Sequence, residues 1–227
     1  GMEVLLLIPE NVAPPLQALV MMPGSDVYFS GARLDGYDWS DYEPSLSAVL
    51  QSGRVLVLPV WEASFGRGMR RPSRANSEEW REYTRSRVLR WRQDLGTTLD
   101  YLETRDDIDS SRIGYIGISA GASAPLAMLA VEPRVKTAVL VAGGLSGLDY
   151  HPLVQPANHV SRITIPVLMI NGRYDQNFML ESQQQPLFDL LGADGDRKKH
   201  VIYDSGHIGY PVSQQQREIN AWLDKWL

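Results

Sequence analysis

Short apolar runs alternate with longer segments in which apolar residues recur every three or four positions, and this alternation constrains the fold more than any other feature. The runs are rich in Val, Ile and Leu, and we expect strands at 4–9, 16–22, 54–60, 112–118, 137–142, 167–171 and 200–204. Continuous apolar runs suit strands that are covered on both faces. The pattern therefore predicts an α/β fold with a mostly parallel central sheet and helices on both sides.

The longest helix is expected from Asn76, which stands at capping-box spacing from Glu79, to about Glu103. Five apolar residues form one stripe along it, which should pack against the sheet: Val88, Trp91, Leu95, Leu99 and Leu102. Five arginines of the same helix are expected on a solvated outer face: Arg81, Arg85, Arg87, Arg90 and Arg92. Further helices are expected after Ser119 and at 180–191 and 212–227.

Length and composition set the broad class of protein. With 227 residues and 44% apolar content, the chain is expected to form one domain over 1–227, with a short cap excursion at about 143–164. The formal charge of -5 gives no attraction to nucleic acid, and the apolar runs are too short to span a membrane. The absence of cysteine excludes a thiolate nucleophile and disulfides.

The segment Gly117-Ile118-Ser119-Ala120-Gly121 places Gly-x-Ser-x-Gly where an apolar run stops and a small-residue helix is expected. This is the context of a nucleophile elbow, in which small neighbours allow a sharp turn that presents the serine hydroxyl. The pattern alone is weak, and an ordinary strand-to-helix turn with a capping serine would have the same letters. Ser119 is the predicted nucleophile.

A serine hydroxyl needs a base, and the base needs an acid that fixes its tautomer. In a sheet of this type, serine, acid and histidine come in that order along the chain, each after the carboxyl end of a strand. His207 comes directly after the last strand, and Asp175 follows the strand before it. The remaining alternatives are a surface or capping role for His207, and Asp204 as the acid in place of Asp175.

Acyl transfer also needs donors for the developing oxyanion. One is expected to be the backbone N–H of Ala120, directly after the nucleophile. The second is expected to be the backbone N–H of Ser25, in the loop after the second strand, where Gly24 allows close approach. A plain turn at Pro23-Gly24 is the other interpretation.

The pocket should lie beyond the carboxyl ends of the strands. Trp61, Tyr174 and Phe178 are expected to line it, although each could equally pack in the scaffold. The basic stretch 66–74 lies near the expected pocket mouth and leads us to expect a preference for anionic substrates. The sequence has no nucleotide-binding glycine motif and no zinc-like spacing of histidine and carboxylate, so we expect no cofactor and no metal.

With these residues placed, the chain resembles the α/β-hydrolase superfamily, and within it the dienelactone-hydrolase-like and acetyl-xylan-esterase-like serine hydrolases. Some motifs are also similar to hydrolase domains appended to bacterial protein kinases: Pro23-Gly24-Ser25, Ser52-Gly53-Arg54, Asp94-Leu95-Gly96, 101–109 and 171–175. The resemblance implies a triad of Ser119, Asp175 and His207, with an oxyanion donor near Ser25. Dienelactone hydrolases themselves use cysteine where this chain has serine.

Members of this group usually begin with a strand ahead of 4–9, so the resemblance predicts that the first strand of the fold is lacking and that the chain is an excised domain or a short form. The expected function is hydrolysis of an ester or thioester bond in a small to medium soluble substrate. The alternative is a non-catalytic binding domain on the same scaffold, which senses a ligand or contacts a partner.

Overall fold

The structure is a computed structural model that describes residues 2–10, 12–28, 32–68, 72 and 77–227. Asn76 lies outside the described residues, so the expected capping pair with Glu79 stays a prediction.

Seven strands form one sheet within the described residues, in the order β1-β3-β2-β4-β5-β6-β7. Only β1 runs antiparallel to its neighbour, and every other pairing is parallel, which confirms the predicted fold class. The strands are β1 (Val4–Leu7), β2 (Leu16–Met22), β3 (Val55–Pro59), β4 (Ile108–Ile118), β5 (Val135–Val141), β6 (Val167–Gly172) and β7 (Lys198–Tyr203).

Each predicted run contains a strand, but β4 begins four residues earlier than its apolar pattern. Ile108 pairs with Leu16, and the register then shifts before Ile113 pairs with Ala18, so the polar residues 109–112 lie in the irregular part of the strand. These polar residues interrupt the apolar run, so the hydrophobic pattern could not reveal the extension.

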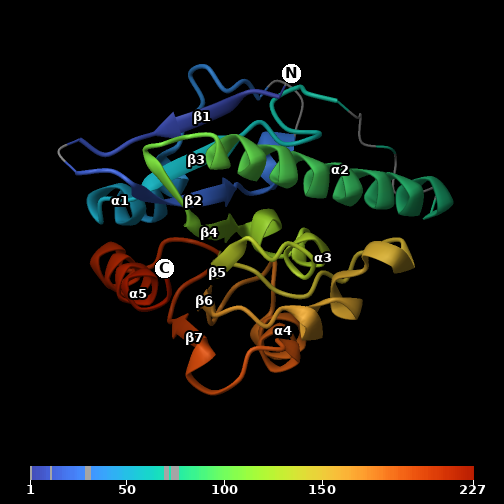
Figure 1. Cartoon of the computed structure of the whole chain (residues 1–227). Helices are drawn as coiled ribbons and strands as arrows, with labels where there is room; N and C mark the ends of the chain where they lie inside the picture. Colours follow the sequence, from blue (N-terminus) through green and yellow to red (C-terminus); the bar gives the residue numbers. More distant parts are fainter. Residues whose placement is uncertain (1, 11, 29–31, 69–71, 73–76) are drawn as a thin grey trace.

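Helices cover both faces of the sheet. Figure 1 shows α1 (Glu43–Gln51) and α5 (Val212–Trp226) on one face, and α2 (Ser77–Glu103), α3 (Leu126–Leu129) and α4 (Gln185–Leu190) on the other. Each layer has its own apolar cluster, with Trp91, Leu95 and Leu99 on the α2 side and Ile219 and Trp222 on the α5 side. None of the helices that the described residues form is long and apolar enough to cross a membrane.

The predicted stripe of α2 is buried, but one of its arginines is not on the outer face. Arg87 is only 7% exposed, because it lies one turn before Trp91 and one turn after Tyr83 on the covered side. Arg85, Arg90 and Arg81 are exposed as expected. The expectation of a solvated face was wrong for Arg87.

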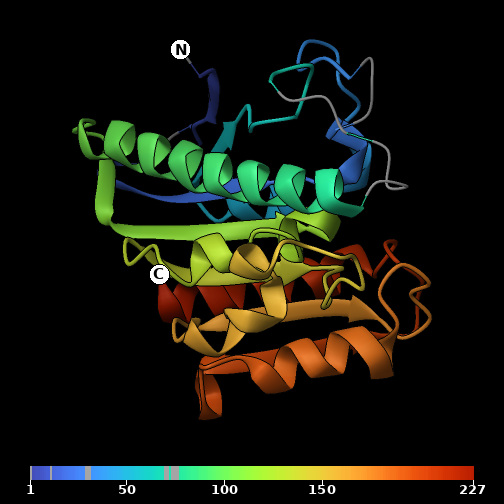
Figure 2. The same cartoon turned by 90° about the vertical axis from the view of Figure 1, so that its right-hand side faces the viewer.

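The carboxyl ends of the parallel strands bring distant parts of the chain together. Figure 2 shows the segments that follow β2, β6 and β7 gathered at one end of the sheet, on the right of the view. At the same end, β4 leads into a tight turn, Ser119–Ala122, and then into the short helix α3, which begins directly after Pro125.

Candidate active site

Ser119 occupies a strained position directly after β4. Its φ is 53°, in the left-handed region that residues other than glycine seldom adopt. A Cβ atom on Gly117 would lie 2.3 Å from the carbonyl oxygen of Gly121, and one on Gly121 would lie 2.1 Å from that of Met22. Only glycine fits at both positions, as the motif predicts, and the turn holds the Ser119 side chain clear of the sheet.

The structure brings the three predicted residues into one hydrogen-bonded chain. His207 Nε2 lies 2.8 Å from Ser119 Oγ, and His207 Nδ1 lies 2.8 Å from Asp175 Oδ2. These residues follow β4, β6 and β7, so the order of the strands places them side by side. Of the remaining histidines, His200 lies within β7 against Asn171, and His151 and His159 lie in the segment after β5.

Asp175 is buried and is held as a carboxylate. Burial alone would raise its pKa, but the hydrogen bond with His207 and those from the N–H groups of Phe178 and Asn177 outweigh burial, so the pKa lies below its ordinary value. One oxygen accepts from the two backbone groups and the other faces the imidazole. The acid is therefore fixed in position as well as in charge.

The alternative acid, Asp204, points elsewhere. Its side chain is 74% exposed and accepts a hydrogen bond from Arg173 Nε at 2.8 Å. The Nδ1 atom of the His207 ring faces Asp175 instead.

A close backbone approach holds the acid and base loops together. A Cβ atom on Gly172 would lie 1.9 Å from the carbonyl oxygen of Gly206, the residue just before His207. Tyr210 adds a second tie, because its hydroxyl donates to the carbonyl oxygen of His207 at 2.7 Å. Tyr210 could not be predicted from the sequence, since a tyrosine two residues before a helix carries no distinctive pattern.

The loop after β2 faces the nucleophile. Ser25 and Ala120 line the same hollow as Ser119, as the oxyanion prediction requires. Tyr42, also missed in the sequence, ties this loop down: its hydroxyl accepts from the N–H of Gly24 at 2.9 Å and donates to the carboxylate of Asp26. The N–H of Ser25 lies between these two ties.

Two hollows open beside Ser119. The first, of about 230 Å³, is lined by Ser25, Ala120, Phe178 and Tyr150, among others. The second, of about 210 Å³, is lined by Asp41, His207 and Ile208. We call them the α2-side hollow and the His207-side hollow.

The three residues predicted to line the pocket lie in three different environments. Phe178 lines the α2-side hollow, and its ring centroid lies 6.0 Å from that of His207. Trp61 is fully buried in the core, where its Nε1 donates to the carbonyl oxygen of Met21 at 2.9 Å, so it lines neither hollow. Tyr174 is 63% exposed and lines neither hollow.

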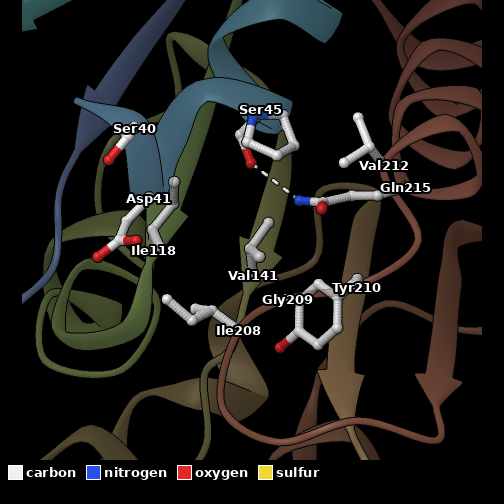
Figure 3. Close-up of a pocket in the computed structure, with 11 residues that line it drawn as sticks. Ser40, Asp41, Ser45, Ile118, Val141, Ile208, Gly209, Tyr210, Val212 and Gln215 are labelled. Carbon is white, nitrogen blue, oxygen red and sulfur yellow. Dashed lines mark hydrogen bonds between the residues drawn. The ribbon is translucent and has the colours of Figure 1, made fainter.

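A further hollow of about 180 Å³ lies behind the His207 loop (Figure 3). It sits between the beginnings of α1 and α5, where Gln215 Nε2 donates to Ser45 Oγ at 3.0 Å. Asp41, Ile118 and Ile208 line both this space and the His207-side hollow, so the two adjoin.

The expected basic stretch at 66–74 lies mostly outside the described residues. Arg67, which is described, forms an ion pair with Asp94 at 2.8 Å. Among the residues that the structure describes, no group of three or more His, Asp or Glu side chains could hold a metal ion.

A mostly parallel sheet with helices on both faces, and with serine, aspartate and histidine in that chain order after the carboxyl ends of strands, defines the α/β-hydrolase class. The sequence profile of the Dienelactone hydrolase family matches residues 48–207, well over half of the chain. The chain belongs to this family, which places it among hydrolases.

One curated relative is a hydrolase by name, in line with the family match. The curated Bacillus subtilis (strain 168) protein "Putative hydrolase YtaP" is 27% identical over 155 residues, which is 66% of this chain and 50% of the relative. The chain thus spans about half the length of that relative. The likeness to kinase-linked hydrolase domains gains no support from these matches.

Solved structures show the same fold. TT1662 from Thermus thermophilus has a TM-score of 0.73 and 20% identity, covering 100% of this chain and 94% of its own. Est1E from Butyrivibrio proteoclasticus, solved with ferulic acid bound, has a TM-score of 0.71 and 13% identity, covering 99% and 94%. An Arctic metagenomic cold-adapted esterase has a TM-score of 0.68 and 20% identity, covering 99% and 88%.

Proposed function

We propose that the chain is a serine hydrolase that cleaves an ester or thioester bond of a small to medium soluble substrate through an acyl-enzyme. The observation that carries this proposal is the unbroken chain of hydrogen bonds from Asp175 through His207 to Ser119, with a hollow on either side of the serine. The His207 imidazole supplies the base that the serine hydroxyl needs, and Asp175 holds that imidazole in the required orientation.

In this mechanism Ser119 Oγ attacks the carbonyl carbon while its proton passes to His207 Nε2. The N–H groups of Ala120 and Ser25 bind the oxyanion, and Asp175 stabilises the imidazolium. The ester C–O bond then breaks and the alcohol leaves with the proton from His207. Water adds to the acyl-enzyme with His207 again as base, which releases the carboxylic acid and restores Ser119.

The two hollows divide the substrate between them. His207 lines only the second hollow, and it must protonate the leaving group, so the alcohol belongs on the His207 side. The acyl group then belongs in the α2-side hollow, whose size of about 230 Å³ suits small and medium acyl groups. Solved relatives of the same fold are esterases by name, which supports this class of reaction.

Fluorophosphonate labelling tests the proposal. The purified protein should be labelled at Ser119, and labelling should be lost in Ser119→Ala and His207→Ala, with turnover of a reactive ester reduced by about 10³-fold or more. Ser213→Ala, which changes an exposed serine of α5, is the matched control and should label like the parent. Absence of labelling in well-folded protein would favour the binding-domain alternative.

A further inference from the structure

The α2-side hollow contains a buried cation without an anion. Arg87 lines this hollow, is 7% exposed, and takes part in none of the ion pairs among the described residues. Its Nε is buried without a hydrogen-bond partner, and its Nη1 makes one long contact of 3.4 Å with the hydroxyl of Tyr83. A guanidinium stays charged at any ordinary pH, so this site carries a permanent positive charge.

Aromatic rings surround the guanidinium of Arg87 but do not supply hydrogen-bond acceptors for its N–H groups. Its carbon lies 4.5 Å from the ring centroid of Trp91, 5.0 Å from that of Tyr83 and 5.9 Å from that of Tyr28. Such contacts offset part of the cost of burying the charge, but a ring face is a weak hydrogen-bond acceptor. The in-plane N–H groups of Arg87 still need an oxygen.

A second donor without a partner lies at the same hollow. The hydroxyl of Tyr28 is buried and has no hydrogen-bond partner. Burial raises the pKa of Tyr28 far above its usual value, so the phenol keeps its proton and remains a donor. Two unsatisfied donors, one of them charged, therefore line the hollow assigned to the acyl group.

We infer that Arg87, with Tyr28, binds a carboxylate at the far end of the substrate's acyl group, so that the preferred substrates are monoesters of short dicarboxylic acids. This inference rests on the proposed function, and Arg87 acts in it as a specificity-determining residue. A carboxylate would supply the acceptor that both donors lack, and charge-assisted bonds in a buried site are strong. The carboxylate lies on the acyl side, opposite the leaving group.

Matched esters test the assignment at low ionic strength. Monomethyl esters of succinic, glutaric and adipic acid are compared with methyl butanoate, pentanoate and hexanoate, which have the same leaving group and the same chain lengths without the charge. In at least one pair, kcat/KM for the anionic ester should exceed that for the neutral one. Arg87→Gln should lower this ratio by about 10- to 100-fold, mainly through KM.

Two milder variants and one control keep the test decisive. Arg87→Lys retains the charge without the planar fork and should keep part of the ratio, and Tyr28→Phe should lower it several-fold. Arg85→Gln removes the same charge from an exposed, ion-paired position on α2 and should leave the ratio intact. If Arg87→Gln does not fold, the Lys and Phe variants carry the test.

A ratio at or below one in every pair, or an anionic preference that survives Arg87→Gln and Tyr28→Phe, overturns the inference. Failure of the proposed function gives a different result, because then none of the six esters is hydrolysed and the fluorophosphonate does not label Ser119. In that case calorimetry with monomethyl glutarate decides the inference alone: binding that disappears in Arg87→Gln supports it, and absence of binding overturns it.

Discussion

Asp175 and Asp204 are the two aspartates that the sequence offers as the acid partner of His207, and their surroundings differ sharply. Asp175 is buried between backbone N–H groups and the imidazole, whereas Asp204 is exposed and paired with Arg173. We expect Asp175→Asn to lower kcat by about 10³- to 10⁴-fold, because the amide would favour the wrong imidazole tautomer. Steady-state kinetics on a reactive ester measures this.

Asp204→Asn is the matched control, since it makes the same chemical change on the neighbouring loop. It should leave kcat within about two-fold of the parent, because a surface ion pair contributes little. Equal losses in the two variants would contradict the assignment of the acid.

His200 is expected to make stability depend on pH. Burial lowers its pKa to about 4, although Asp189 acts in the opposite direction, and its Nδ1 is buried without a partner. The unfolded chain takes up the proton near pH 6.5, before the folded protein does. The free energy of unfolding should therefore fall as the pH is lowered from about 6.5 to about 4.

Because solvent reaches part of the His200 ring, we expect this loss to be about 2 kcal/mol. Denaturant unfolding at several pH values measures it. His200→Gln can keep a polar contact with Asn171 and does not titrate, so this part of the pH dependence should disappear in it. An identical pH profile for the variant would rule out His200 as the source.

At the scale of elements, the segment from Ser40 to Tyr42 positions the loop after β2. The Tyr42 hydroxyl accepts a hydrogen bond from the Gly24 N–H and donates one to the Asp26 carboxylate. Tyr42→Phe should let the Ser25 N–H move away from the oxyanion and lower kcat by about 10- to 100-fold, with a smaller change in KM. Kinetics with a neutral ester separates the two constants.

Tyr37→Phe is the control for this prediction. The Tyr37 ring centroid lies 6.4 Å from that of Tyr42, but the Gly24 N–H and the Asp26 carboxylate bond to the Tyr42 hydroxyl and not to that of Tyr37. Its kcat should stay close to the parent value. A Tyr42→Phe protein with raised KM and unchanged kcat would show that the tyrosine acts on substrate binding instead.

Elements with strong local patterns could be predicted from sequence, and contacts between distant elements could not. Apolar runs and a Gly-x-Ser-x-Gly turn depend on neighbouring residues, so the strands and the tight turn at Ser119 could be predicted, while the role of Ser119 as nucleophile stays a prediction. Trp61 was misplaced because an aromatic residue after a strand packs inward or outward according to distant partners, here the Met21 carbonyl. The spacing of Tyr83, Arg87 and Trp91 did contain a signal, since residues four apart share a helix face.

At the scale of the whole molecule, two apolar clusters lie on opposite faces of one sheet. Leu99 belongs to the α2-side cluster and Ile219 to the α5-side cluster, and both are fully buried. If residues 1–227 form one domain, Leu99→Ala and Ile219→Ala should each lower stability by about 2–5 kcal/mol within a single transition. Calorimetry and near-ultraviolet circular dichroism should then give the same midpoint.

A separate transition for one variant would instead mean that the two layers unfold independently. Val212→Ala, at a half-exposed position at the start of α5, provides a control that should shift the midpoint little.

Under the proposed mechanism, the two hollows beside Ser119 also set the order of events in each turnover, because the alcohol must leave before water can enter the same space. Once the first alcohol has left, the space lined by His207, Asp41 and Ile208 is the route by which water reaches the acyl carbon. A different alcohol in that space would be activated by the same imidazole and would accept the acyl group in place of water. Hydrolysis and transesterification would then compete at one position, and the ratio of acid to new ester would report how well each alcohol fits there.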